Sequence, residues 1–115
     1  MRITLYYSRK KLKINLKKTG FISKYSGLMF KSKKTENLLF DFQKDTNLSF
    51  TSLFVFFPFL IIWLNEKNKV LDFQIIKPFR FVINPDRKYR KVAEIPINAK
   101  NKKIIKFFVG KRRKI

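Results

Sequence analysis

Three clusters of Lys and Arg are the residues in this chain whose types and spacing could do chemistry. Ammonium and guanidinium groups donate hydrogen bonds to phosphate oxygens, and a guanidinium can bind a phosphate through two of them. This chemistry suits neutralisation of a polyanion. The clusters are Arg9, Lys11, Lys13 and Lys17; Arg87, Lys88, Tyr89, Arg90 and Lys91; and Lys111, Arg112, Arg113 and Lys114.

Each cluster has two interpretations. In SRKKLKINLKK the cations and Asn15 alternate with apolar residues at two-residue steps, which spaces the cations along a strand as a nucleic-acid backbone requires. Lysines on an edge strand also block aggregation. In PDRKYRK the cations surround Tyr89, which we expect either to stack on an RNA base or to pack on the core. VGKRRKI predicts a basic arm that binds phosphates, or a tail that only aids solubility.

The composition excludes most kinds of catalytic site. The chain has no Cys, and so no disulfides or thiolate metal sites, and it has no His, the most frequent general base and metal ligand. Its three glycines form no loop that could cradle a phosphate. We therefore predict no enzymatic activity, no cofactor, no metal site and no small-molecule substrate.

The charge is concentrated at the two ends of the sequence. Residues 1–34 carry eleven Lys or Arg and no acid, residues 35–76 carry three against five acids, and residues 77–115 carry fourteen against two. The net charge of +21 on 115 residues would cause strong self-repulsion without counter-charge. The distribution predicts a nearly neutral core with two basic flanks and a polyanionic partner.

The segment TSLFVFFPFLIIWLNEKNKV contains twelve consecutive apolar residues, 53–64. As a helix they would rise only about 18 Å against a hydrocarbon thickness of roughly 30 Å, and Pro58 would kink them. We therefore predict no membrane span, but two core strands that meet at Pro58. The first residues also lack the apolar stretch of a secretory signal, so we expect a cytoplasmic protein.

Alternating and continuous apolar patterns predict a mainly β fold with one short helix. The helix is expected over 19–30, where Phe21, Tyr25, Leu28 and Met29 share one face. The predicted strands are 2–7, 11–17, 38–42, 51–57, 59–64, 69–76, 77–83, 91–97 and 103–109. We expect one domain over residues 1–110, a small β-barrel or rolled sheet, with basic terminal extensions that include a tail at 111–115.

Several of these segments, in this order, resemble the DUF192 family. The segments are SGLMFK (26–31), LLFDF (38–42), the long stretch from 54 to 79, KVAEIP (91–96) and FFVGK (107–111). The likeness covers about residues 20–112 and is greatest to the archaeal branch. It implies a compact β-rich fold with a short helix at the GLMF segment, and it implies little about activity because the family's function is unknown.

The chain departs from the family pattern at four places. It has Leu60 where members often have Asp, Phe50 to Phe54 where they have a His or a Trp-Met pair, and Gly110-Lys111 in place of a closing Gly-Asp. The Gly after the Glu-Ile-Pro motif is also missing. These changes affect any polar ligand site that the family residues form, and members are not usually this basic.

Composition and patterning together predict a structural RNA-binding protein. We expect an accessory ribosomal protein in the cytoplasm that contacts rRNA phosphates and neighbouring ribosomal proteins. The alternatives are a peripheral membrane protein that binds anionic lipids, and an architectural DNA-binding protein.

Overall fold

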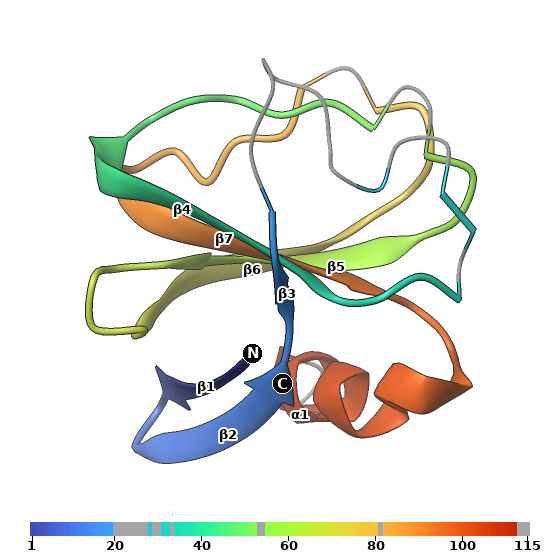
Figure 1. Cartoon of the computed structure of the whole chain (residues 1–115), viewed down its shortest axis with the longest axis horizontal. Helices are drawn as coiled ribbons and strands as arrows, with labels where there is room; N and C mark the ends of the chain where they lie inside the picture. Colours follow the sequence, from blue (N-terminus) through green and yellow to red (C-terminus); the bar gives the residue numbers. More distant parts are fainter. Residues whose placement is uncertain (20–27, 29–30, 33, 53–54, 81, 113–115) are drawn as a thin grey trace.

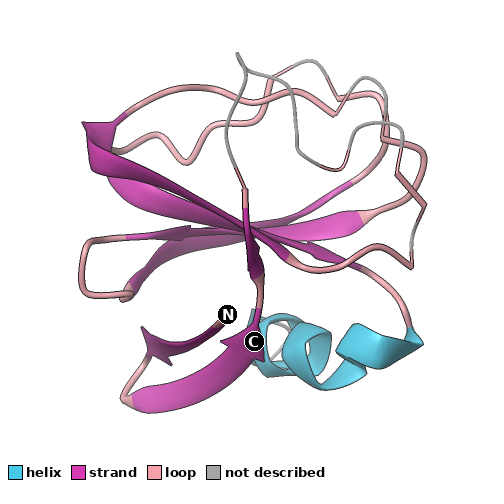
Figure 2. Ribbon diagram, viewed as in Figure 1, coloured by secondary structure: helices cyan, strands magenta, loops and turns pink. Residues whose placement is uncertain are grey.

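The computed structural model describes residues 1–19, 28, 31–32, 34–52, 55–80 and 82–112. Its elements in chain order are β1 (Arg2–Tyr7), β2 (Lys10–Asn15), β3 (Lys17–Lys18), β4 (Leu38–Thr46), β5 (Phe59–Leu64), β6 (Val70–Ile76), β7 (Tyr89–Pro96), the 3-10 turn η1 (Ala99–Asn101) and α1 (Lys102–Arg112). The predicted mainly β fold is confirmed, and the described residues include one short α-helix, α1, at a different place from the predicted one. The elements form three layers: β1, β2 and α1, then the main sheet, then long loops (Figures 1 and 2).

The main sheet has five strands in the order β3-β4-β7-β5-β6. The short β3 pairs in parallel with β4, and the other neighbours are antiparallel. The pairings of the described residues leave this sheet open, with β1 and β2 forming a separate hairpin. The prediction of a β-barrel or rolled sheet therefore fits only in part, because the sheet is not closed into a barrel. A layer on each face of the sheet removes its apolar surface from water without closure.

Strand β5 is the centre of the core and confirms the prediction for residues 59–64. All six of its residues are buried. Phe59, Ile61 and Trp63 pack into a cluster on the loop side of the sheet. Leu60, Ile62 and Leu64 pack into a second cluster on the side of the hairpin and helix. A continuous apolar run is expected where a strand has protein on both faces.

Two predicted strands, 51–57 and 77–83, are absent from the described parts of these segments. In this region Phe50 and Ile83 form an isolated antiparallel bridge. Side-chain hydroxyls replace part of the ladder, since Thr51 Oγ1 donates to the carbonyl of Arg80 at 2.9 Å. Pro78 also lacks the backbone donor that a strand would use. These segments are the loops of the third layer.

The predicted strand at 103–109 is also wrong, because these residues belong to helix α1. Asn98 caps the preceding turn η1, with its Oδ1 accepting from the Asn101 backbone N–H at 3.0 Å. Along α1 the apolar residues recur with helical spacing, and Phe108 is fully buried against the sheet. The β-branched and aromatic composition that favoured a strand is overridden by this packing.

The helix predicted over 19–30 lies outside the described residues, except for its ends near Thr19 and Leu28. Leu28 is fully buried and belongs to the cluster on the loop side of the sheet.

Strands β1 and β2 confirm the predicted strand 2–7 and most of the predicted strand 11–17, and they pair as a hairpin whose turn is strained. Ser8 and Arg9 form a two-residue loop with φ of 51° and 65°. A turn of this type favours Asn-Gly, because left-handed backbone costs most residues about 1–2 kcal/mol.

We therefore expect the double variant S8N/R9G to raise the free energy of unfolding by about 1 kcal/mol. Urea unfolding followed by circular dichroism measures the change. The single variant S8N keeps the arginine and should give the smaller part of the gain. A double variant no more stable than the wild type would show that the turn stores no strain.

Candidate nucleic-acid interface

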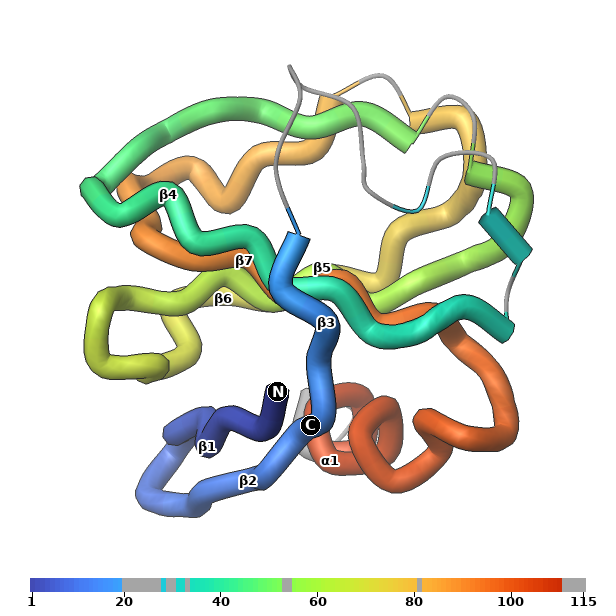
Figure 3. The backbone as a smooth tube through the Cα atoms, viewed as in Figure 1, coloured from blue at the N-terminus to red at the C-terminus, as the bar shows by residue number. Residues whose placement is uncertain are grey.

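The hairpin, the helix and the short strand β3 that follows the hairpin together form a strongly basic surface, which we name the cationic layer. It comprises residues 1–18 and 99–112, which carry thirteen Lys or Arg and no Asp or Glu. Figure 3 shows β1, β2 and α1 on the same side of the sheet, with β3 leading from the hairpin into the sheet. The cations whose side chains are described are all exposed: Arg2, Arg9, Lys10, Lys11, Lys13, Lys17, Lys18, Lys100, Lys102, Lys103 and Lys106.

Aromatic and aliphatic side chains attach this layer to the sheet. Leu5 and Ile14 of the hairpin and Phe108 of α1 are buried in the same cluster as residues of β5. The Tyr7 ring contacts Phe73 of β6 edge-on, with 5.5 Å between centroids, and lies 5.8 Å from Phe108. The alternation predicted for the first cluster is therefore observed in part: Ile14 and Leu16 are buried, while Lys11, Lys13 and Lys17 face solvent.

A cleft of about 520 Å³ separates β2 from the start of α1. Four lysines line it, Lys13 and Lys17 from the hairpin side and Lys100 and Lys103 from the helix side. Glu36 is the one acidic residue in its lining. We name this feature the basic cleft. Because cations lie on both of its walls, an anion between them would relieve their repulsion.

The cations at the start of α1 are in an unfavourable place for a helix on its own. Lys102 and Lys103 occupy its first turn, which has no acidic residue, and Lys100 lies in η1 just before it. The N-terminal end of a helix carries partial positive charge, so lysines there are repelled and anions are attracted. A phosphate group bound at this end of the helix would be attracted both by the lysines and by the partial positive charge of the helix.

Asn101 joins the two sides of the basic cleft. Its Oδ1 accepts from Asn37 Nδ2 at 3.0 Å, and its own Nδ2 donates to the carbonyl of Pro96 at 2.8 Å. Asn37 Nδ2 also donates to the carbonyl of Asn15, at the end of β2, at 3.3 Å. Both amide side chains are at least nine-tenths buried. These bonds fix the position of the helix relative to the hairpin.

We expect N101A to lower the free energy of unfolding by about 2–3 kcal/mol, because it removes two buried side-chain hydrogen bonds and leaves their partners unsatisfied. Urea unfolding checks this value. The exposed neighbour Lys100 provides the control, since K100A should change stability by less than about 0.5 kcal/mol. Equal stability of N101A and wild type would show that the amide bonds do not hold the cleft.

The structure places the second predicted cluster outside the cationic layer. Its residues lie at the start of β7 and in the turn that precedes this strand. Tyr89 is buried, so its predicted exposure for base stacking is wrong, and the alternative of packing on the core is observed. Its ring contacts Phe42 and Phe50, and its hydroxyl donates to the carbonyl of Leu48. Burial raises the pKa of Tyr89, which keeps this phenol a hydrogen-bond donor.

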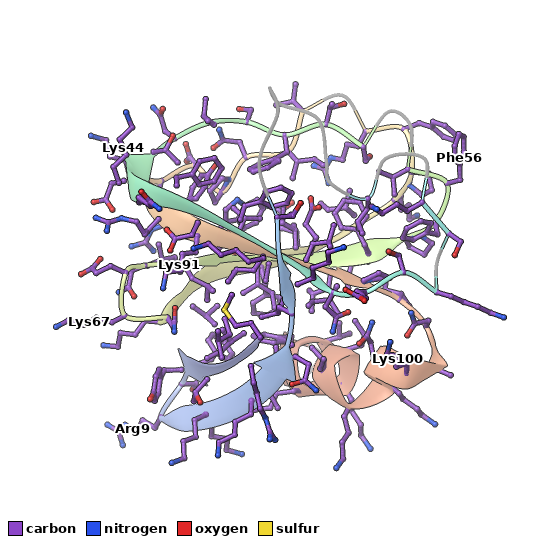
Figure 4. All side chains as sticks on the ribbon, in the orientation of Figure 1. Arg9, Lys44, Phe56, Lys67, Lys91 and Lys100 are labelled. Atoms are coloured by element: carbon purple, nitrogen blue, oxygen red, sulfur yellow. The ribbon has the colours of Figure 1, made fainter. Side chains whose placement is uncertain are left out.

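The cations beside Tyr89 lie among acidic and polar groups. Arg90 forms an ion pair with Asp45 at 3.4 Å, and Lys91 Nζ donates to Asn68 Oδ1 at 2.8 Å. Lys44, Lys67 and Lys91 lie at one end of the sheet, away from Lys100 (Figure 4). The exposed Arg87 and Lys88 follow Asp86 directly. This end has mixed charge, unlike the cationic layer.

The third predicted cluster divides at the end of the helix. Lys111 and Arg112 are the last residues of α1, whereas Arg113 and Lys114 lie outside the described residues. Helix α1 therefore places at least the start of this cluster in the same layer as the first cluster.

The acidic residues of the described part of the chain do not gather into a cluster of metal ligands. No group of three or more His, Cys, Asp or Glu side chains converges within that part. Asp72 Oδ1 accepts from the Phe73 backbone N–H at 2.8 Å, and Glu94 is fully buried in β7. A search of the described helices finds none that could cross a bilayer.

Sequence reasoning missed the lysines of η1 and α1 as members of the interface: Lys100, Lys102, Lys103 and Lys106. A signal for them was present. Ile104, Phe107 and Phe108 have the three- and four-residue spacing of a helix, and Asn98 is a favourable cap. A helix over these residues would have suggested that the basic C-terminal segment forms a surface of its own.

Fold and surface together define a small, open-sheet β protein with a basic layer of hairpin and helix. Comparison with known proteins gives the family. Residues 5–109 match the DUF192 family model, described as "Uncharacterized ACR, COG1430", and the chain belongs to this family. The predicted resemblance is thereby confirmed for the family as a whole. A search of the curated proteins finds no match.

Two solved structures share the fold. One is a protein of unknown function from Novosphingobium aromaticivorans, with a TM-score of 0.66 and 13% identity over 90% of this chain and 76% of that one. The other is described as a "putative transcription regulator" from Sinorhizobium meliloti, with a TM-score of 0.68 and 13% identity over 90% and 84% of the chains. At this identity the likeness concerns the fold alone.

Proposed function

We propose that this protein is a non-catalytic RNA-binding protein whose cationic layer binds the phosphate backbone. One observation carries the proposal: two distant segments of the chain, which together hold thirteen cations and no acids, pack beside each other. Self-repulsion within such a layer destabilises the folded protein unless a polyanion is bound. The basic cleft adds a concave site in which phosphates meet cations from two sides.

The mode of binding follows from the kinds of residue in the layer. Its described exposed side chains are mainly Lys and Arg, which position a nucleic acid through phosphate contacts and carry little information about base sequence. Recognition would be led by charge and shape. We further propose that the RNA is ribosomal RNA. The protein would then be an accessory component of the ribosome, beside other ribosomal proteins, in the cytoplasm. Membership of the archaeal branch stays a prediction.

The salt dependence of binding tests the proposal. With about eight phosphates neutralised, the logarithm of the association constant should fall with the logarithm of salt concentration at a slope of about −5 to −7. Fluorescence anisotropy with labelled RNA and DNA of one sequence measures this slope. Equal or tighter binding of DNA would favour the architectural DNA-binding alternative.

Sedimentation tests the ribosomal part. In a sucrose gradient of native lysate, the protein should migrate with a ribosomal subunit and leave it after RNase treatment or in high salt. Sedimentation at the top of every gradient would overturn this part. Binding to phosphatidylserine vesicles that survives nuclease treatment would favour the membrane alternative.

A further inference from the structure

Two exposed aromatic rings lie in the loop layer, on the opposite side of the sheet from the cationic layer. Phe56 is 58% exposed and Phe79 is 55% exposed. Their rings are in edge contact, with 5.6 Å between centroids and 71° between planes. Figure 4 shows Phe56 at the margin of the loops, far from Arg9 and Lys100. We name Phe56 and Phe79 the aromatic pair.

Buried Ser52 holds the two loops that carry the aromatic pair. Its carbonyl accepts from the backbone N–H groups of Val55, at 3.1 Å, and of Phe79, at 2.9 Å. Its hydroxyl accepts from the Arg80 N–H at 2.7 Å and donates to the carbonyl of Lys77 at 3.0 Å. Because one residue binds both loops, the rings are positioned before any partner arrives.

The backbone of Phe79 is strained although its ring gains little from burial. Its φ is 63°, in the left-handed region that a bulky side chain rarely adopts. Glycine would fit this backbone without strain. Retained strain of this kind is typical of functional sites.

The charge around the aromatic pair is positive. Lys77 and Arg80 are exposed on either side of Pro78 and Phe79. Residues 73–85 contain no Asp or Glu, and residues 46–65 contain no charged residue. Exposed rings beside cations are the combination that binds single-stranded nucleic acid, since the rings stack on bases and the cations contact phosphates.

We propose that the aromatic pair stacks on unpaired bases of RNA, with Lys77 and Arg80 on the flanking phosphates. This inference rests on the proposed function and adds the kind of RNA that is bound, namely one with unpaired nucleotides. Because the pair and the cationic layer lie on opposite sides of the sheet, the protein contacts two segments of one folded RNA.

The test compares a labelled oligouridylate with an RNA duplex of equal length by fluorescence anisotropy. F79A and F56A should each weaken binding of the oligouridylate by about 5- to 100-fold, the loss of one base stack, and leave duplex binding unchanged. F79W should retain binding. Leu48 is another exposed apolar residue in the loop layer, so L48A serves as the control and should change neither affinity.

A folding defect is excluded with F79G, which should melt a few degrees higher than the wild type because it removes the strain, yet bind the oligouridylate as weakly as F79A. If the wild type binds both RNAs and F79A binds each of them with the affinity of the wild type, the inference fails while the proposed function stands. If the wild type binds neither RNA, the proposed function itself fails. If F79A loses binding to phosphatidylserine vesicles but binds both RNAs as the wild type does, the inference is overturned in favour of a lipid partner.

Discussion

The triple variant K13Q/K100Q/K103Q is expected to bind RNA about 10- to 100-fold more weakly than the wild type at physiological salt. These three lysines line the basic cleft from both sides. Each one replaced removes a phosphate contact, so the slope of the salt dependence should become shallower by about 2–3. Fluorescence anisotropy over a range of salt concentrations measures both quantities. The lysines are exposed, so the fold should be unaffected.

The chain provides a matched control for this prediction. The variant K44Q/K67Q/K88Q also removes three positive charges from exposed lysines, but these lysines lie at the mixed-charge end of the sheet. This control should lose less than threefold in affinity, because only the general field is reduced. Equal losses in the two variants would show that binding depends on net charge, or that the cluster around Lys88 is the interface, and would contradict the assignment to the cationic layer.

The second large effect concerns stability. F108A should lower the free energy of unfolding by about 3–5 kcal/mol, since it leaves a cavity where a fully buried ring meets Phe73 at 5.0 Å between centroids. This loss is a large fraction of the total stability of a typical domain. Urea unfolding gives the value.

The same helix supplies the control. Lys106 is exposed on α1, so K106A should change stability by less than about 0.5 kcal/mol. F108A should also weaken RNA binding, because it loosens the helix that carries half of the basic cleft. A stable F108A protein that binds RNA normally would show that α1 is not needed for the interface.

Patterns that depend on neighbours in sequence were predictable. The alternation in residues 11–17 located strand β2, and the apolar run of 59–64 identified the central strand correctly. Both patterns report burial on particular faces, which the local sequence records directly. The basic character of both ends of the chain was also evident, although their assembly into one layer was not.

Features that depend on tertiary contacts were not predictable. Residues 103–109 combine β-branched and aromatic residues with helical spacing, and packing on the sheet decided between the two. Residues 53–57 are apolar like a strand, but the buried hydroxyl of the preceding Ser52 binds a distant loop. Tyr89 sits among cations in sequence yet is buried, because the pairing of β7 turns its ring into the core.

The order of strands in the sheet affects how the protein folds during synthesis. Among the described strands, β7 leaves the ribosome last, and it lies between β4 and β5. Until it emerges, β5 has an open edge with six apolar residues, and β4 cannot join it. The nascent chain must therefore keep this segment from aggregating, and chaperone binding at residues 59–64 would serve that need. The complete sheet can form only after Pro96, the last residue of β7, has left the ribosome.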